Sequence, residues 1–564
     1  MPARKDRLSR FGFLALVALT VVAASPAAAQ EGPTTYRTFP YVTPAGDLTG
    51  DGLADTLTNE TTYENQVEGV ASFFPTDSIS ALRGIDGSSL WQLESRADLL
   101  LPAPLGQDAE SGVLVVDGAY TGSAGWGGGS VGLVGSFGES AQLRELTLTA
   151  LDGDGGVLWE RPFDVGAFAG MAVFNELSGP HQVVAVAQYP LFAGLLQATP
   201  SPAVDALVTI LSRQEVGGEI RSVLNMWIVD GADGEVAASF SLGTEGSRTA
   251  AAPTGDLDGD GLDDLVVARH PASANLRAFS AIDGEPIWTS GDDVVPFTAF
   301  VEDLGDVTGD DIDELAVRGF GDIYDEAPPR VTVLNGADGS ALLAETASTI
   351  SAVGPVGGGR IGLLTQTHDA AGSAIVYRLF DGSGTSLAAR SVPVPEDDED
   401  TYVSFMPVAG DLDGDGALDA GHVFVRTDGQ GGTTTEDRTV LSGRTLETLL
   451  DGDAGIPFLA SLDGAGDDLV LVERSSQDAF RIVAQDGAGG EQLWAQALTA
   501  DPAYTRMGRI SVSPADVDGD GVPDVILNIE TWRPVQTTGG GSSSEYVRQA
   551  WVLRGTDGSV LWSV

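Results

Sequence analysis

The sequence contains no cysteine among its 564 residues and only one lysine, Lys5. The lack of cysteine excludes disulfides, thiolate metal ligands and cysteine nucleophiles together. Basic residues are scarce: 29 Lys and Arg stand against 82 Asp and Glu, which gives a formal net charge of −53. Because a phosphate backbone requires a basic surface, nucleic acid is excluded as a partner, and an anionic membrane surface is an equally poor one.

Long apolar runs and catalytic signatures are also missing. The apolar run at residues 11–24 is shorter than the ~20 residues that a helix needs to cross a membrane. No His-x-x-x-His pair, Gly-x-Ser-x-Gly nucleophile elbow or phosphate-binding loop stands out. The sequence therefore indicates no catalytic residue and no residue that would bind an organic cofactor.

The N-terminal segment has the pattern of an export signal. Basic residues including Lys5 precede the apolar run, and the small residues Ala27 and Ala29 predict cleavage before Gln30. A retained N-terminal anchor is the alternative. We expect residues 1–29 to be a signal peptide, 30–45 a linker and 46–564 the folded unit. The mature protein is then expected to be secreted, either extracellular or associated with the cell surface, without a membrane span.

The chain is rich in glycine, with 74 residues, and in two alternating repeats. An acidic motif occurs five times, each time before a short run of apolar strand-forming residues. The second motif is a tight turn, usually Asp-Gly, between apolar stretches that often end on Trp, and Asp-Gly is a strong hairpin signal. Together they predict an all-β chain that forms a single β-propeller of about eight or nine four-stranded blades with calcium-binding loops. A β-solenoid or a row of sandwiches is the alternative.

The acidic motif has the ligand spacing of a calcium loop. At residues 256–264, carboxylates stand at loop positions 1, 3, 5 and 9, and Gly at position 6 permits a sharp turn. Alternating oxygens, with a backbone carbonyl at position 7, suit the roughly six to eight ligands of Ca²⁺. The candidate metal ligands are Asp47, Thr49, Asp51, Asp55, Asp256, Asp258, Asp260, Asp264, Asp306, Thr308, Asp310, Glu314, Asp411, Asp413, Asp415, Asp419, Asp516, Asp518, Asp520 and Asp524.

Two of these loops deviate from the pattern, and four further copies are degenerate. Thr49 and Thr308 replace a carboxylate, and Asp311 stands where Gly is expected, so both loops should bind more weakly. Between the remaining hairpins we interpret segments near Leu105, Leu177, Val356 and Leu462 as copies that have lost their carboxylates. The alternative for all the loops is Asp/Gly turn chemistry on an acidic surface without metal.

The motif Gly-Asp-x-Asp-Gly-Asp-Gly-x-x-Asp, clearest from Asp256, Asp411 and Asp516, resembles the FG-GAP repeats of the integrin α-chain propeller and the VCBS repeats of exported microbial proteins. The resemblance implies Ca²⁺ in the loop carboxylates and a propeller made rigid by it. The Asp-Gly-x-x-Leu-Trp hairpins also resemble the tryptophan-docking turns of quinoprotein propellers. We expect the recurring tryptophans to pack between blades, the alternative being a sugar-stacking platform; they are Trp91, Trp159, Trp288, Trp494 and Trp562.

The sequence favours a non-enzymatic function. We expect a secreted calcium-binding propeller, a monomer, that acts as a binding or adhesion module for an extracellular protein or glycan at the cell surface. The alternative is an extracytoplasmic enzyme on the same scaffold, either a quinoprotein-like oxidoreductase or a polysaccharide lyase or hydrolase. Acidic residues are so abundant that a catalytic carboxylate pair is not recognisable from sequence.

Overall fold

A computed structural model describes the chain from the first strand to the C-terminus with gaps. The described residues are 35–64, 77–94, 97–121, 142–164, 188–216, 219–244, 248–270, 275–291, 294, 298–320, 329–369, 372–394, 401–428, 433–453, 455–464, 466–474, 479–499, 506–536 and 542–564. The expected signal peptide, residues 1–29, lies outside them. Regular structure in the described part is entirely β, and it includes no helix long and apolar enough to cross a membrane.

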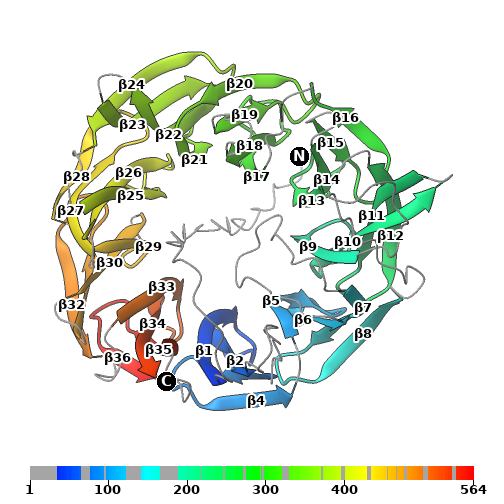
Figure 1. The fold of residues 1–564 in the computed structure, drawn as a ribbon, viewed down its shortest axis with the longest axis horizontal. Helices are drawn as coiled ribbons and strands as arrows, with labels where there is room; N and C mark the ends of the chain where they lie inside the picture. The colour runs from blue at the N-terminus through cyan, green and yellow to red at the C-terminus, as the bar shows by residue number, and fades with distance from the viewer. Residues whose placement is uncertain are drawn as a thin grey trace, which may run out of the picture.

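The described strands form nine four-stranded antiparallel sheets that lie as blades around a ring (Figure 1). This confirms the expected all-β propeller and gives it nine blades. Blade 1 contains β1 (Thr35–Gly46), β2 (Asp55–Glu64), β3 (Asp77–Leu82) and β4 (Ser89–Glu94). Blade 2 contains β5 (Ala97–Leu105), β6 (Glu110–Thr121), β7 (Gln142–Leu151) and β8 (Val157–Asp164). Blade 3 contains β9 (Gln188–Leu196), β10 (Asp205–Val216), β11 (Glu219–Val229) and β12 (Val236–Thr244).

The next three blades follow the same order. Blade 4 contains β13 (Arg248–Thr254), β14 (Asp264–His270), β15 (Leu276–Phe279) and β16 (Pro286–Thr289). Blade 5 contains β17 (Thr298–Gly305), β18 (Glu314–Phe320), β19 (Arg330–Leu334) and β20 (Ala341–Thr346). Blade 6 contains β21 (Thr349–Pro355), β22 (Arg360–Asp369), β23 (Gly372–Asp381) and β24 (Ser386–Pro393).

The last three blades complete the ring. Blade 7 contains β25 (Thr401–Gly410), β26 (Asp419–Asp428), β27 (Thr433–Leu441) and β28 (Thr448–Asp453). Blade 8 contains β29 (Ile456–Ala460), β30 (Asp468–Arg474), β31 (Ala479–Gln485) and β32 (Gln492–Thr499). Blade 9 contains β33 (Arg506–Ala515), β34 (Asp524–Gln536), β35 (Ser542–Leu553) and β36 (Val560–Ser563).

The first strand begins earlier than the sequence indicates. β1 covers Thr35–Gly46 and pairs with β2, so most of the stretch assigned to a linker, residues 30–45, is the first strand of blade 1. The pairing has irregularities between Thr38 and Tyr41 and between Pro44 and Gly46. Proline is uncommon inside strands because it has no N–H for the ladder, which explains why the pattern did not predict a strand here.

The hydrophobic core lies between the blades. Each apolar cluster joins residues of two neighbouring blades, including one cluster in which Val42 of blade 1 meets Val552 of blade 9. Successive residues of one strand therefore face different neighbours: Leu527 packs toward blade 8 and Ile526 toward blade 1. Because both faces are buried, these second strands are continuous apolar runs.

The tryptophans dock on the hairpin of the following blade, which confirms their predicted packing between blades. Each indole N–H donates to a backbone carbonyl in the neighbouring hairpin; the pairs are Trp91–Gly153, Trp159–Gly231, Trp288–Gly336, Trp494–Gly555 and Trp562–Gly84. The same indoles cover a second glycine of each turn, Gly155, Gly234, Gly339, Gly558 and Gly87, where a Cβ would come too close to the ring.

The ring closes without a shared strand, because blades 1 and 9 each consist of four consecutive strands. Trp562 of the last strand docks on blade 1 at Gly84. The side chain of Asn528 adds a reciprocal pair: its Oδ1 accepts from the N–H of Val42 and its Nδ2 donates to the carbonyl of Val42, both at 2.9 Å. Closure thus depends on side-chain docking and on a backbone hydrogen bond, in which the N–H of Ala54 donates to the carbonyl of Asp516 at 2.9 Å.

Candidate metal-binding loops

The acidic loops all connect the first and second strands of their blades. In blade 4 the loop follows β13, and its position 9, Asp264, is the first residue of β14. Because the strands alternate in direction, the Asp-Gly hairpins between third and fourth strands lie at the same end of each blade as the acidic loops. One face of the ring thus carries both kinds of turn.

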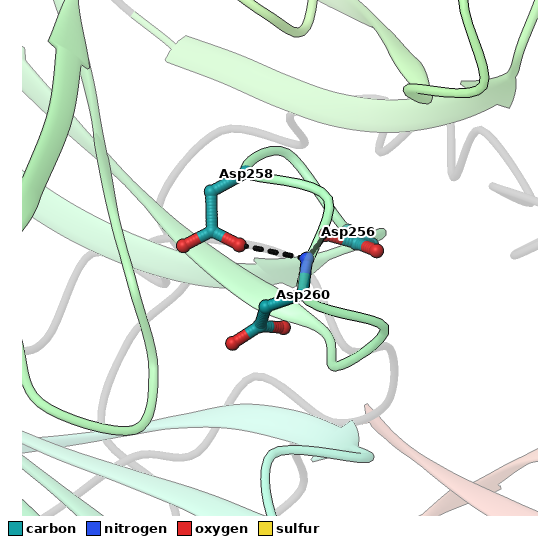
Figure 2. Close-up of side chains that lie close together, drawn as sticks. All are labelled: Asp256, Asp258 and Asp260. Atoms are coloured by element: carbon teal, nitrogen blue, oxygen red, sulfur yellow. Dashed lines mark hydrogen bonds between the residues drawn. The ribbon is translucent and has the colours of Figure 1, made fainter.

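The loop of blade 4 shows how the carboxylates are oriented (Figure 2). Asp256 accepts backbone N–H groups with both oxygens, from Gly259 at 2.7 Å and from Gly261 at 2.7 Å. Asp258 Oδ1 accepts from the N–H of Asp260 at 3.1 Å, and Asp260 Oδ1 accepts from Leu262 at 2.8 Å. Only one oxygen of Asp258 and one of Asp260 is used in these bonds. The second oxygen of each could therefore bind a cation.

The structure brings together carboxylates of three predicted loops, in each case with one oxygen per residue within 4.8 Å of the others. The groups are Asp256, Asp258 and Asp260 in blade 4; Asp411, Asp413 and Asp419 in blade 7; and Asp516, Asp518 and Asp524 in blade 9. The remaining expected ligands of these loops, Asp264, Asp415 and Asp520, are not in the groups. No metal ion is included in the structure, so the identity of an ion follows only from the ligand chemistry.

The two deviating loops do not form such groups among the described residues. In blade 1, Asp47, Asp51 and Asp55 are not gathered in this way, and Thr49 Oγ1 is buried without a hydrogen bond. In blade 5, Thr308 Oγ1 donates to Glu314 Oε1 at 3.1 Å, so the hydroxyl binds the carboxylate directly. Asp306 and Asp310 lie in the same loop, where they accept backbone N–H groups.

The carboxylate at position 9 also accepts hydrogen bonds from two separate segments, which the spacing did not indicate. Asp419 Oδ2 accepts from the N–H of Leu412 at 2.8 Å, while Oδ1 accepts from Gly443 at 2.7 Å. Asp55, Asp205, Asp468 and Asp524 make the same two kinds of bond. The position-9 carboxylate therefore ties the acidic loop to the hairpin of its own blade.

The hairpin glycines connect these bonds to the next contact around the ring. The N–H of Gly555 donates to Asp524 at 2.8 Å, and its carbonyl accepts from Trp494 of blade 8 at 2.6 Å. A Cβ on Gly555 would lie 2.1 Å from the carbonyl oxygen of Pro523, so only glycine fits. Gly84 and Gly231 likewise donate to the position-9 aspartate of their own blade and accept from a tryptophan of the preceding blade. The geometry of an acidic loop is thereby linked to the docking of the preceding blade.

Burial shifts the acidity of the loop carboxylates. It raises the pKa of Asp264 to about 7, with the charges of Asp258 and Asp256 adding to the effect and the N–H of Leu257 opposing it. Burial likewise raises the pKa of Asp419 and of Asp524 to about 6. In blades 4 and 7, burial and neighbouring carboxylates also raise the pKa at position 3. A nearby cation would favour the charged forms.

Arginines approach three of the loops from the hairpin side. Arg554 Nε lies 2.6 Å from Asp518 Oδ2, Arg444 Nε lies 2.9 Å from Asp415 Oδ2, and the pair Arg83–Asp51 is looser at 3.8 Å. These guanidinium groups compensate part of the negative charge in blades 9, 7 and 1. In the loop of blade 4, Asp283 adds a further negative charge near Asp258.

Two loops were missed or misplaced by the sequence analysis. In blade 8, the segment near Leu462 has not lost its carboxylates: Asp463, Asp468 and Asp486 have oxygens within 4.8 Å of one another. The shortened Gly464–Gly466 spacing hid the pattern. In blade 3, the expected remnant near Leu177 lies outside the described residues, and the loop is at residues 197–204. The signal that could have found it is Asp205 directly before an apolar run, as in Asp264.

Comparison with known proteins gives distant likenesses only. No family model matches the sequence and no curated protein matches it. Among solved structures, the chain is similar to a rhamnogalacturonan lyase of Bacillus licheniformis, with 14% identity over 91% of this chain and 72% of that chain and a TM-score of 0.38. A eukaryotic initiation factor has 12% identity over 95% of this chain and 96% of that chain, with a TM-score of 0.43. A quinohemoprotein alcohol dehydrogenase of Pseudomonas putida HK5 has 12% identity over 88% and 71%, with a TM-score of 0.32.

Proposed function

We propose that the chain is a calcium-binding β-propeller in which loop cations hold neighbouring blades in place. The observation that carries this proposal is the convergence of three carboxylates in each of the loops of blades 4, 7 and 9. In blade 7, Asp411 Oδ1 is buried and has no hydrogen-bond partner among the described residues. A buried anionic oxygen is costly without a compensating partner, and a cation would supply one.

The ligand chemistry favours calcium. The candidate donors are carboxylate and carbonyl oxygens, which suit the hard ions Ca²⁺ and Mg²⁺. Mg²⁺ demands a near-ideal octahedron and retains several waters, whereas Ca²⁺ accepts irregular loops with more oxygens. An acidic loop that supplies several side chains and a position-7 carbonyl from one short segment fits the second description.

We further propose that the protein is secreted and serves as a non-enzymatic binding module for a protein or glycan at the cell surface. The face with the acidic loops and hairpins is repeated from blade to blade, as expected for a structural device. At the opposite ends of the blades, the number of residues between the second and third strands differs, from two between β22 and β23 to twenty between β6 and β7. Variable connections on a rigid scaffold favour recognition. The FG-GAP resemblance and the alternative of an enzyme stay predictions.

Thermal unfolding of the purified chain in Ca²⁺, in Mg²⁺ and in chelator, at low and high salt, tests the cation. Ligand bound only by the native state stabilises it by RT ln(1 + [L]/Kd) per site. We expect a rise of the midpoint that is specific to Ca²⁺. Asp260→Ala should lower the midpoint more in Ca²⁺ than in chelator, whereas the control Asp233→Ala, in the hairpin of blade 3, should act equally in both. Equal losses for Asp260→Ala would refute its role as a ligand.

The binding role needs a separate experiment. Labelled protein is applied to glycan arrays and to cell surfaces in Ca²⁺ and in chelator, and saturable binding that is lost in chelator is the expected result. A parallel assay offers a dye-linked alcohol and a panel of polyanionic sugars. Turnover in that assay would contradict the non-enzymatic role and favour the enzyme.

A further inference from the structure

The loop of blade 3 occupies the place of an acidic loop, but its first residue donates hydrogen bonds where the other loops have an accepting carboxylate. Position 1 is Gln197 instead of aspartate, and Pro200 and Pro202 stand at positions 4 and 6. Position 9 is unchanged: Asp205 is fully buried and accepts from the N–H groups of Ala198 and Thr199, as in the sister loops. The frame of the loop is therefore retained while its centre differs.

The prolines remove the donors that an aspartate at position 1 would use. In blade 4, Asp256 accepts from the N–H groups of Gly259 and Gly261, at positions 4 and 6. Proline has no N–H, so a carboxylate at position 197 would find no donor at either place. Gly259 and Gly261 also have φ values of 82° and 91°, which proline cannot adopt because its ring fixes φ near −65°.

Gln197 instead donates to the loop. Its side-chain Nε2 lies 2.9 Å from the carbonyl oxygen of Thr199, 2.6 Å from that of Ser201 and 3.2 Å from that of Ala203. These carbonyls belong to loop positions 3, 5 and 7. One polar group therefore gathers three oxygens of a short segment around a single point, which is the arrangement that a cation produces in an oxygen-lined loop.

We propose that the side-chain amide of Gln197 replaces a loop cation, so that the loop of blade 3 is closed in the absence of metal. This inference rests on the proposed function, because the amide is a replacement only if the sister loops take up cations. The loop of blade 3 is also bonded to the loop of blade 4. The N–H of Gln197 donates to Asp263 Oδ2 at 2.8 Å, and the N–H of Asp263 donates to the carbonyl of Gln197 at 2.9 Å. The junction between blades 3 and 4 thus has a metal-independent anchor.

Hydrogen exchange measured by mass spectrometry tests this, because it reports each loop separately. The wild-type chain is compared in Ca²⁺ and in chelator with Gln197→Met, which retains the size of the side chain but lacks the donors, and with Gln197→Glu. Gln496→Met is the matched control, since the Nε2 of Gln496 donates within the described residues to the carbonyl of the adjacent Ala497 alone. The readout is the peptide that contains residues 197–204, beside peptides from the loops of blades 4, 7 and 9.

In the wild-type chain, we expect chelator to speed exchange in blades 4, 7 and 9 but not in blade 3. Gln197→Met should speed exchange in the blade 3 loop by about tenfold in both conditions, because several hydrogen bonds are lost together. Gln197→Glu places a carboxylate against three carbonyls, so its loop should exchange fast in chelator and slow down again in Ca²⁺.

Two results would overturn the inference: exchange in blade 3 that is unchanged by Gln197→Met, or a Gln197→Glu loop that does not respond to Ca²⁺. Failure of the proposed function looks different, since exchange in blades 4, 7 and 9 would then be the same with Ca²⁺ and with chelator. The Gln197→Met result does not depend on Ca²⁺, so the two failures are distinguishable.

Discussion

Aspartate and glycine build two kinds of turn on one face of this ring, and the two differ in what they need. In the hairpins, Asp86 and Asp557 have a lowered pKa because the side chain and N–H of the serine two residues on, Ser88 and Ser559, bond to the carboxylate. In the acidic loops, burial and neighbouring carboxylates raise the pKa of residues such as Asp264. The hairpin carboxylates accept hydrogen bonds within their own turn, which favour the charged form. The loop carboxylates lie close to one another, and the fold keeps them there despite the repulsion between their charges.

The difference shows that composition alone does not define a metal site. Both turns are rich in Asp and Gly, yet only the loops concentrate carboxylates whose charged form is disfavoured by their surroundings. The two systems meet at the hairpin glycines, where Gly555 joins Asp524 of the loop to the docked Trp494. A cation in the loop would therefore reinforce a contact between blades that also exists without it.

The docked tryptophan should give the largest effect and no dependence on metal. Trp562 is buried against Gly87 and donates to Gly84, and this contact closes the ring. Trp562→Ala should lower stability by about 3–5 kcal/mol, measured by denaturant unfolding, equally in Ca²⁺ and in chelator. Trp562→Phe is the control and should lose less, because Phe240 lies over Gly284 at the corresponding place in blade 3. A loss present only in Ca²⁺ would contradict the separation of the two systems.

Blade 9 allows a direct comparison of the two aspartates. Asp557 accepts from the N–H of Ser559 in the hairpin, and Asp516 accepts from Gly519 and Gly521 in the loop. Asp557→Ala should lower stability only slightly, and equally in any condition, because this exposed carboxylate loses only its turn hydrogen bonds. Asp516→Ala should cost roughly 1–2 kcal/mol in chelator and more in Ca²⁺, because a cation ligand is lost as well. Thermal unfolding of both variants, with and without Ca²⁺, checks this; parallel behaviour would remove the distinction between the turns.

Local repeats made the architecture predictable. The spacing of Asp-Gly turns and apolar runs gave the propeller, its range of blade number and the docking of residues such as Trp494, because each blade is built from consecutive strands. β1 was hidden because Pro40 and Pro44 interrupt its pattern. The expected ligand positions 1 and 3 came together in blades 4, 7 and 9, since short loops fix their own side chains.

What could not be predicted depends on contacts between segments. The bonds from Asp419 to the hairpin at Gly443, and from Arg554 to Asp518, join residues that are distant in sequence. The Gln197 loop lacks the acidic signature altogether, and its meaning is visible only when the three carbonyls surround the amide. A sequence pattern indicates which residue types could bind a ligand. Which neighbouring segment hydrogen-bonds to those residues or neutralises their charge is known only from the fold.

The pH dependence of the metal-free protein should separate the two turns by sign. Asp264, Asp419 and Asp524 have folded pKa values of about 7, 6 and 6, above the usual value of 3.8. Their protonated forms stabilise the fold fully below that usual value, and this contribution is lost as pH rises through about 7. In chelator, the unfolding midpoint should therefore fall by a few degrees between pH 5 and pH 7.5.

Calcium should reduce this fall, since a cation favours the charged carboxylates. The measurement is repeated at about 1 M salt, where the Debye length is about 3 Å and general surface repulsion is screened. The hairpin aspartates titrate in the opposite sense, because a lowered pKa contributes stability that is lost only as pH falls below the ordinary range. A midpoint in chelator that does not fall between pH 5 and pH 7.5 would show that the loop carboxylates behave like those of the hairpins.

The smallest expected effect concerns one backbone angle in blade 5. Asp311 has a φ of 68° at position 6, where the loops of blades 4 and 9 have Gly261 and Gly521. The left-handed region is unfavourable for side chains other than those of glycine, although aspartate tolerates it better than most. Asp311→Gly relieves this strain but makes the unfolded chain more flexible, so stability should rise by less than about 1 kcal/mol.

The reciprocal change in blade 4 is the matched control. Gly261 has a φ of 91° and open space around its Cβ position, so Gly261→Asp adds backbone strain without a clash. It also adds a negative charge to the loop that already holds Asp256, Asp258 and Asp260. We expect thermal unfolding in chelator to show a small rise for Asp311→Gly and a fall for Gly261→Asp. Ca²⁺ should reduce the fall in midpoint for Gly261→Asp but leave the rise for Asp311→Gly unchanged, because the loop of blade 4 gathers three carboxylates whereas that of blade 5 does not. A fall for both variants would mean that Asp311 stabilises its loop through its charge or its hydrogen bonds, and that the strain at this position is not what sets blade 5 apart.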